Sequence, residues 1–194
     1  MSEKQSLGYP SRRKEIVDAA RQIAAADGWP AVTVRAVASR IGCSAPALYQ
    51  YFRDKDEILD ALAAEGRSVL AERMEQELSE TGHGPSKRLR AAVRVLWEFA
   101  QTNPELYAVM FGLSGQDNHG GGGPALSLLR RVAAELAQKR EAAEDAEDLA
   151  DSLIAAAHGF IALALAGQFP GGADRAMSLL LALAENTAKG VGRK

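Results

Sequence analysis

Apolar residues recur at helical spacing in one segment of this chain after another, and this periodicity limits the folds that it can adopt. In the first segment Ile16, Ala20 and Ile23 lie three or four positions apart. No stretch alternates apolar and polar residues over a run of β-branched side chains, as a half-buried strand does. We therefore predict an all-α fold of about nine helices. They are expected at 11–27, at 33–40, over a very short stretch from 44, and at 54–80, 87–101, 104–111, 124–143, 144–168 and 173–189.

Residues that begin and end helices stand at matching positions. Gly28 fits the left-handed position after the first helix, and Pro30 prevents that helix from continuing. The segment 112–123, GLSGQDNHGGGG, is typical of a loop. The residues that we expect to cap helix starts are Ser11, Thr33, Ser44, and Asp54 with Glu57 three positions later in the capping-box spacing.

The charge of the chain is divided unevenly. Residues 1–55 hold nine Lys and Arg against five acids, a formal +4, so residues 56–194 carry −6 of the total of −2. This asymmetry favours a first segment that meets a polyanion, although ordinary scatter would also explain it. We predict two domains with the boundary after residue 55, at 1–55 and at 56–194.

Composition also limits where the protein acts. The single Cys43 leaves no disulfide framework, and the opening MSEKQSLGYP has no apolar run of the signal-peptide type. The most apolar stretch, 149–167, contains Asp151 and His158, which argues against a membrane span. We expect a cytoplasmic protein without a membrane partner and without a cofactor.

Two closely spaced helices have the pattern of a helix-turn-helix. Only about three residues join TVRAVASR to the helix that opens at Ser44. Ala38 is small where the next helix crosses close to it, and Gly42 permits the turn. The residues expected to pack inward across the motif are Val37, Ala38, Ile41, Cys43 and Leu48.

The third helix carries the residues that we expect to read DNA. Pro46 falls in its first turn, where the missing N–H leaves no bond unmade. Tyr49 and Tyr51 are two positions apart, so they cannot share a helix face and at least one points outward. The predicted roles are major-groove contact for Ala45, Pro46 and Ala47, a base edge for Gln50, and phosphates for Tyr49, Tyr51 and Lys55. The alternative for each tyrosine is half-buried packing.

Over residues 28–59 the chain resembles the DNA-binding domain of the TetR family of bacterial repressors. The motif is carried by Gly28-Trp29, Thr33, Val37-Ala38, Gly42, Ser44, Leu48-Tyr49, Phe52, Lys55 and Leu59. Cys43 and Tyr51 depart from it, since valine and histidine are common there. The resemblance implies a homodimer on a partly palindromic operator and release by a small, apolar molecule. Thr33 and Arg35 are then further DNA contacts, whereas Arg12, Arg13 and Lys14 are either phosphate contacts or a solvated basic end.

In the second segment the resemblance implies ligand binding and dimerisation. The last two helices are apolar nearly all round, so we expect the dimer interface at Ala156, Gly159, Ala164, Leu180 and Leu183; the alternative is a helix buried in a monomer. The ligand pocket is expected at Trp97, Tyr107, Met110, Phe111, His158 and Phe160, with core packing as the alternative for each. The NPxLY stretch at 103–107 and His158-Gly159 resemble one type of C-terminal domain in this family, although the tryptophan common before the His-Gly pair is absent.

An enzyme is not expected. The chain has three histidines, at His83, His119 and His158, without HExxH spacing, and it has no paired cysteines for a metal. The GGGG run does not follow a predicted strand and lacks a following Lys-Ser/Thr, so it is no phosphate-binding loop. We therefore predict no catalytic residue and no metal site. A helical interaction protein that does not bind DNA remains the third possibility.

Overall fold

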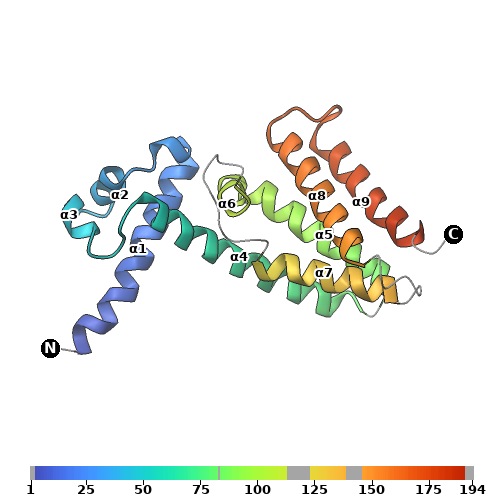
Figure 1. Cartoon of the computed structure of the whole chain (residues 1–194). Helices are drawn as coiled ribbons and strands as arrows, with labels where there is room; N and C mark the ends of the chain where they lie inside the picture. Colours follow the sequence, from blue (N-terminus) through green and yellow to red (C-terminus); the bar gives the residue numbers. More distant parts are fainter. Residues whose placement is uncertain (1–2, 83, 113–122, 139–145, 191–194) are drawn as a thin grey trace. The chain divides into compact units, whose positions relative to one another are not determined.

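The computed structural model describes residues 3–82, 84–112, 123–138 and 146–190, and within these ranges the protein is helical (Figure 1). The all-α prediction is confirmed. The described residues form nine α-helices and one 3₁₀ turn: α1 (Glu3–Asp27), η1 (Trp29–Ala31), α2 (Val34–Arg40), α3 (Ala45–Leu48), α4 (Lys55–Glu80), α5 (Pro85–Thr102), α6 (Pro104–Met110), α7 (Gly123–Gln138), α8 (Ala146–Leu165) and α9 (Gly172–Gly190). Most of the predicted loop at 112–123, and residues 139–143 of the predicted seventh helix, lie outside the described residues.

Three predicted helix starts are confirmed by their capping hydrogen bonds. Thr33 Oγ1 accepts from the Ala36 N–H at 3.1 Å and begins α2. Ser44 Oγ accepts from the Ala47 N–H at 3.4 Å and begins α3. Asp54 Oδ1 accepts from the Glu57 N–H and begins α4. Because these bonds join residues three positions apart, they could be predicted from local spacing alone.

The predicted start of the first helix at Ser11 is wrong, because α1 begins at Glu3 and carries Pro10 inside it. Proline disfavours a helix interior, since it removes one backbone N–H and crowds the preceding turn. Tyr9, in the added turns, stacks on Tyr51 with ring centroids 5.0 Å apart. The first turns of α1 thus form although Pro10 disfavours them locally, and they carry a tertiary contact, the stack of Tyr9 on Tyr51.

Gly28 ends α1 in a conformation that side chains rarely adopt. Its φ of 78° is positive, as predicted, but its ψ of 169° takes the chain out of the left-handed helical region. The chain continues directly into η1, where Trp29 is buried and its Nε1–H donates to the Glu105 carbonyl oxygen at 3.0 Å. Trp29 thereby connects η1 to α6.

The chain divides into two compact units. Unit 1 comprises Met1–Gly66 and Glu105–His119, and unit 2 comprises Arg67–Pro104 and Gly120–Lys194. The division falls within α4, so that helix contributes residues to both units. The domain boundary expected after residue 55 lies eleven residues before this point, since 66 − 55 = 11.

Unit 1 places the helix-turn-helix on a small apolar core. The fully buried side chains around the helix-turn-helix come from α1, α2, α3, the turn after α3, and α4, and they include Ile16, Ala20, Val37, Leu48, Phe52, Ile58 and Leu62. Since α2 and α3 are seven and four residues long, neither is long enough to be stable alone in water. Packing of α2 against α1, and of α3 against α2, therefore holds them in place.

Unit 2 is a helical bundle with its own core. Figure 1 shows α8 and α9 side by side, and both also pack against α5. The fully buried residues of this core include Leu70, Met74, Leu89, Leu96, Leu129, Val132, Ala157, Ile161 and Leu180. This bundle leaves part of α8 and part of α9 exposed to solvent.

Candidate nucleic-acid interface

The turn between α2 and α3 closes as the sequence predicts. Gly42 has φ 66°, and the Cys43 N–H donates to the Ala38 carbonyl oxygen at 2.9 Å. Val37, Ala38 and Leu48 are buried, which confirms their predicted inward packing. Ile41 and Cys43 are only half-buried, because they lie in the turn rather than on the inner helix faces. The result is two short helices in a fixed relation to each other.

The outer side of α3 presents small apolar side chains. Pro46 is exposed in the first turn of the helix, and Ala45 and Ala47 are half-buried. Because none of these side chains extends far, another molecule can approach the backbone of α3 closely. This is a surface suited to apolar contact with the methyl groups of thymine.

The three residues after α3 have different environments. Tyr49 is 55% exposed, and Gln50 is also exposed. Tyr51 is half-buried because its ring stacks on Tyr9. The two tyrosines thus face different surroundings, as their spacing predicts, and Tyr49 is the one that points outward.

Three further predicted DNA contacts lie on α2 and at the start of α4. Thr33 and Arg35 are exposed. Lys55 is half-buried, and its Nζ donates to the Trp29 carbonyl oxygen at 3.1 Å. An ammonium group has three donors, so this bond leaves Lys55 able to donate to a phosphate as well.

Acidic residues neutralise much of the basic charge near this face. Among residues 8–55, whose side chains the structure describes, Arg35, Arg40 and Lys55 are the cations that are not paired with a carboxylate. The cations with carboxylate partners are Arg12 (Glu15), Arg13 (Glu57), Lys14 (Asp18 and Glu65), Arg21 (Asp18 and Glu65) and Arg53 (Asp54). Arg35, exposed and without a carboxylate, is therefore better placed for a phosphate than Arg12, Arg13 or Lys14.

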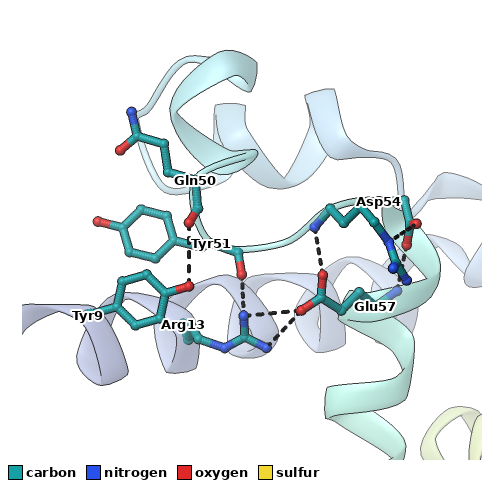
Figure 2. Close-up of polar contacts among 7 residues, drawn as sticks. Tyr9, Arg13, Gln50, Tyr51, Asp54 and Glu57 are labelled. Atoms are coloured by element: carbon teal, nitrogen blue, oxygen red, sulfur yellow. Dashed lines mark hydrogen bonds and ion pairs between the residues drawn. The ribbon is translucent and has the colours of Figure 1, made fainter.

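The start of α4 is held by a reciprocal cap, which Figure 2 shows. Asp54 Oδ1 accepts from the Glu57 N–H at 2.8 Å, and Glu57 Oε2 accepts from the Arg53 N–H at 2.7 Å. This confirms the predicted capping box. The bond from the Glu57 N–H, together with the Arg53 guanidinium, lowers the pKa of Asp54, so the cap is ionised at neutral pH.

Sequence reasoning missed Tyr9, and it named Arg13 without its contact in this region. Tyr9 donates from its hydroxyl to the Gln50 carbonyl oxygen at 3.4 Å, and Arg13 donates from Nη1 to the Tyr51 carbonyl oxygen (Figure 2). The two residues are four positions apart on α1, which places them on one face. That spacing was the available signal, but it does not show what the face contacts.

The structure does not gather the six predicted ligand residues into one unit. Tyr107, Met110 and Phe111 belong to unit 1, where the rings of Tyr107 and Phe111 lie 4.7 Å apart. Trp97, His158 and Phe160 belong to unit 2. The ring of Phe160 lies 5.3 Å from that of Phe169.

Burial explains the titration of two of these residues. It raises the pKa of the Tyr107 hydroxyl and lowers the pKa of His158, in each case because the charged form is less well solvated. His158 is therefore neutral at pH 7. A hollow of about 240 Å³ in unit 2 is lined by Arg73, Gln76, Glu77, Glu80, Val95, Glu98 and Phe99, and none of the six predicted residues is among them.

The predicted dimer residues differ in exposure. Gly159 is exposed, with open space where a Cβ would lie, and Ala156 and Ala164 are half-buried. Leu183 is 37% exposed, whereas Leu180 is 0% exposed, so its side chain is enclosed by its own protomer and faces no partner. Two leucines that the prediction left out, Leu163 on α8 and Leu179 on α9, are each 43% exposed.

Two properties of the described residues bear on metal and membrane binding. No group of three or more His, Cys, Asp and Glu side chains among them could hold a metal ion. By length and composition one of their helices, over Glu147–Leu165, is apolar enough to cross a membrane, and 28% of that window is buried. Within unit 2 this helix packs against α7 and α9.

Comparison with known proteins identifies two matching domains. Residues 16–62 match the model of bacterial regulatory proteins of the tetR family, and residues 89–185 match the tetracyclin repressor-like C-terminal domain. The first match covers the helix-turn-helix described above. The second lies within α5 to α9.

Individual relatives agree with this assignment. The chain is 37% identical over 110 residues to the HTH-type transcriptional repressor KstR of Mycolicibacterium smegmatis, covering 56% of this chain and 53% of KstR. It is 32% identical over 116 residues to the nucleoid occlusion factor SlmA of Edwardsiella ictaluri, covering 58% and 56%. It thus spans about half the length of these relatives. A Rhodococcus sp. RHA1 structure, titled as a protein with unknown function, superimposes with a TM-score of 0.76 at 25% identity, covering 93% of this chain and 95% of that one.

The two domain matches together cover most of the chain, and they agree with the capped helix-turn-helix of unit 1 and the helical bundle of unit 2. The chain belongs to the TetR family of bacterial regulatory proteins, a non-enzymatic family.

Proposed function

We propose that this regulator is a cytoplasmic repressor that binds a palindromic operator as a homodimer and is released by a small, apolar molecule. The observation that carries the proposal is the outward face formed by Pro46, Tyr49 and Gln50, which are exposed on and after a capped α3. In this proposal residues 1–55 are the DNA-binding domain and residues 56–194 are the regulatory and dimerisation domain. The name of KstR, a transcriptional repressor, supports repression rather than activation.

The proposed contacts with the operator are of two kinds, contacts with base edges and contacts with phosphates. Ala45, Pro46 and Ala47 approach thymine methyl groups in the major groove, and Gln50 hydrogen-bonds a base edge. The residues proposed to contact the phosphates are Thr33, Arg35, Ser44, Tyr49, Tyr51 and Lys55. This division is supported by exposure, since Gln50 and Tyr49 are exposed and Arg35 has no carboxylate partner in the described chain.

The proposed dimer uses the exposed side of α8 and α9. Three large apolar side chains, Leu163, Leu179 and Leu183, are exposed on these neighbouring helices. Exposed leucines are unfavourable in water, and a second copy of the chain would cover them. The open space at Gly159 lets another helix approach closely, with Ala156 and Ala164 on the same helix.

The proposed ligand response requires two states of the protein. The ligand binds among aromatic and apolar residues of the regulatory domain, and the candidates within unit 2 are Trp97, His158 and Phe160. Since α4 contributes to both units, a change in its direction would alter the spacing of the two α3 helices in the proposed dimer. The ligand acts only if it binds one spacing more tightly than the other.

The test begins with selection of bound sequences from a random duplex pool by the full-length chain. The proposal expects enrichment of a palindrome whose half-sites are about one helical turn apart, bound with two chains per duplex. A chain that binds no duplex at low salt would instead be an interaction protein without DNA. Small apolar molecules are then screened for release of the selected duplex, and the absence of any releasing compound would contradict the ligand response alone.

A further inference from the structure

Tyr9 joins α1 to the turn that follows the reading helix α3 (Figure 2). Its ring stacks on Tyr51 with an angle of 30° between the ring planes, and its hydroxyl makes a long hydrogen bond to the Gln50 carbonyl oxygen. The stack is thus the stronger part of the contact. Its partner Tyr51 directly follows the exposed Gln50, the residue proposed to read a base.

Arg13 makes a second connection one helical turn further along α1. Nη1 donates to the Tyr51 carbonyl oxygen, and both terminal nitrogens lie 3.3 Å from Glu57 Oε1. The guanidinium carbon also lies 3.9 Å from the centroid of the Phe52 ring. One side chain therefore contacts the backbone of the turn, a buried ring of the turn and the cap of α4.

The turn needs such support because α3 is short. A helix of four residues makes few internal hydrogen bonds, and the carbonyl groups at its end need partners from outside. At Gln50 and Tyr51 these partners are side chains from α1. Since a side chain points where its backbone directs it, the contacts from α1 set the direction in which Gln50 projects.

We propose that Tyr9 and Arg13 are positioning residues for sequence reading, which act on operator selectivity through the backbone of Gln50 and Tyr51. They do so without touching DNA. This inference rests on the proposed function, since it requires that the face beside Gln50 reads bases.

A direct phosphate contact by Arg13 is the competing role, and the two roles differ in what they change. A phosphate contact strengthens binding to every duplex and contributes about 0.9 to the slope of log K against log salt. A positioning contact changes only the preference for the operator over other sequences. The ion pair with Glu57 favours positioning, because it already neutralises the Arg13 charge.

The experiment compares Arg13→Gln with Arg12→Gln in the full-length protein. Both remove one guanidinium from α1, but the carboxylate partner of Arg12 is Glu15, on the same helix. Affinity is measured for the duplex selected by the unaltered chain and for a scrambled duplex of equal length. We expect Arg13→Gln to lower the ratio of the two affinities about tenfold, the effect of losing about one base contact, and Arg12→Gln to leave it unchanged.

Further variants test whether the effect on operator selectivity passes through the contacts of Tyr9, Glu57 and Gln50. Tyr9→Phe keeps the stack and should retain most of the ratio, whereas Tyr9→Ala should lower it. Glu57→Gln removes an acid, which by charge alone would strengthen binding to both duplexes, but we expect the ratio to fall. In a Gln50→Ala background, Arg13→Gln should lower the ratio no further, because the reading residue is already absent.

The ratio is measured on one sample, so an unfolded fraction cancels, and thermal unfolding shows which variants are folded. Equal ratios for Arg13→Gln and Arg12→Gln would overturn the inference. So would a uniform loss on both duplexes with a shallower salt slope, which indicates a phosphate contact. If the unaltered chain does not distinguish the two duplexes, the proposed function fails as well, before any variant is compared.

Discussion

The outward face of α3 in unit 1 and the outward face of α8 and α9 in unit 2 are exposed in different ways. Beside α3, polar contacts from α1 hold the backbone of Gln50 and Tyr51, while Tyr49 projects into solvent. On α8 and α9, the exposed side chains are leucines such as Leu163 and Leu179. The first face is stable when exposed, but the second leaves apolar surface in contact with water.

This difference supports the partner proposed for each face. A surface of small apolar and exposed polar side chains, with the uncovered Arg35 on the neighbouring α2, suits a charged, hydrated partner such as DNA, which can associate and dissociate as salt and ligand change. Apolar side chains gain free energy when they are covered, and they suit a stable contact with a second copy of the chain.

The double variant Leu179→Asp/Leu183→Asp should give a monomer. Charged residues cannot be buried in an apolar interface without a partner, and a monomer binds only one half-site. We expect affinity for a palindromic duplex to fall about a hundredfold, since the two half-sites no longer bind together. Sedimentation equilibrium and duplex titration measure the two effects, with Gln101→Asp, exposed on α5, as the control. A dimer that survives the double change would place the interface elsewhere.

Lys55→Ala should weaken operator binding about tenfold, because a hydrogen bond to a charged group contributes about 1.5–3 kcal/mol. The slope of log K against log salt should also fall by about 0.9. Lys55→Arg, which keeps the charge, should retain the slope. An unchanged slope in the alanine variant would mean that Lys55 serves only the Trp29 carbonyl oxygen.

Two glycine substitutions should act with opposite signs on stability. Gly42 has φ 66° and open space around it, so Gly42→Ala should destabilise the protein by about 1–2 kcal/mol through backbone strain alone. Gly159 lies inside α8 with open space, so Gly159→Ala should stabilise the protomer by about 0.5–1 kcal/mol. Urea unfolding at low protein concentration compares them. If Gly159→Ala also weakens the dimer, the close approach of helices at that position is supported.

Tyr49→Phe should weaken operator binding a few-fold, since one hydrogen bond contributes about 0.5–1.5 kcal/mol. The tyrosine is 55% exposed, so the fold should be unaffected. Titration with operator and with scrambled duplex should show the same loss for both, because a phosphate contact carries no sequence information. A loss confined to the operator would instead assign Tyr49 to a base.

His158 predicts a small dependence of stability on pH. Burial lowers its folded-state pKa below the ordinary 6.5, so the unfolded chain binds more protons as the pH falls through that value. His158 therefore does not reduce the free energy of unfolding above pH 6.5. As the pH falls from 6.5 toward the folded-state pKa, the unfolded chain takes up the proton first, and the free energy of unfolding decreases. We expect His158→Gln to reduce the fall in Tm between pH 7.5 and 5.5. An equal fall in both proteins would show that other groups cause it.

Local spacing was sufficient to predict most of the reading head. Thr33, Ser44 and Asp54 cap their helices as expected, because a cap depends only on residues three positions away. The start of α1 was not predicted, because Pro10 argues locally against the helix that the structure contains. Lys55 was expected to face a phosphate, and its bond to Trp29, 26 residues earlier, has no signal in the sequence.

The leucines of α9 show the same limit in unit 2. Leu179, Leu180 and Leu183 are equivalent by composition, since this helix is apolar on more than one side. Only the packing of α9 against α5 and α8 decides that Leu180 is enclosed and the other two are exposed. Periodicity predicts a helix, but it does not show which side of a largely apolar helix its own chain covers.

The sequence alone determined that this chain is helical, where most helices begin, and that α2 and α3 form a helix-turn-helix. These features depend on contacts between neighbours in the chain, which residue order specifies directly. Tertiary packing alone places Arg13 and Tyr9 against the turn after α3, and it also determines which leucines are exposed. Such contacts join residues far apart in the chain, so they exist only once the helices have packed.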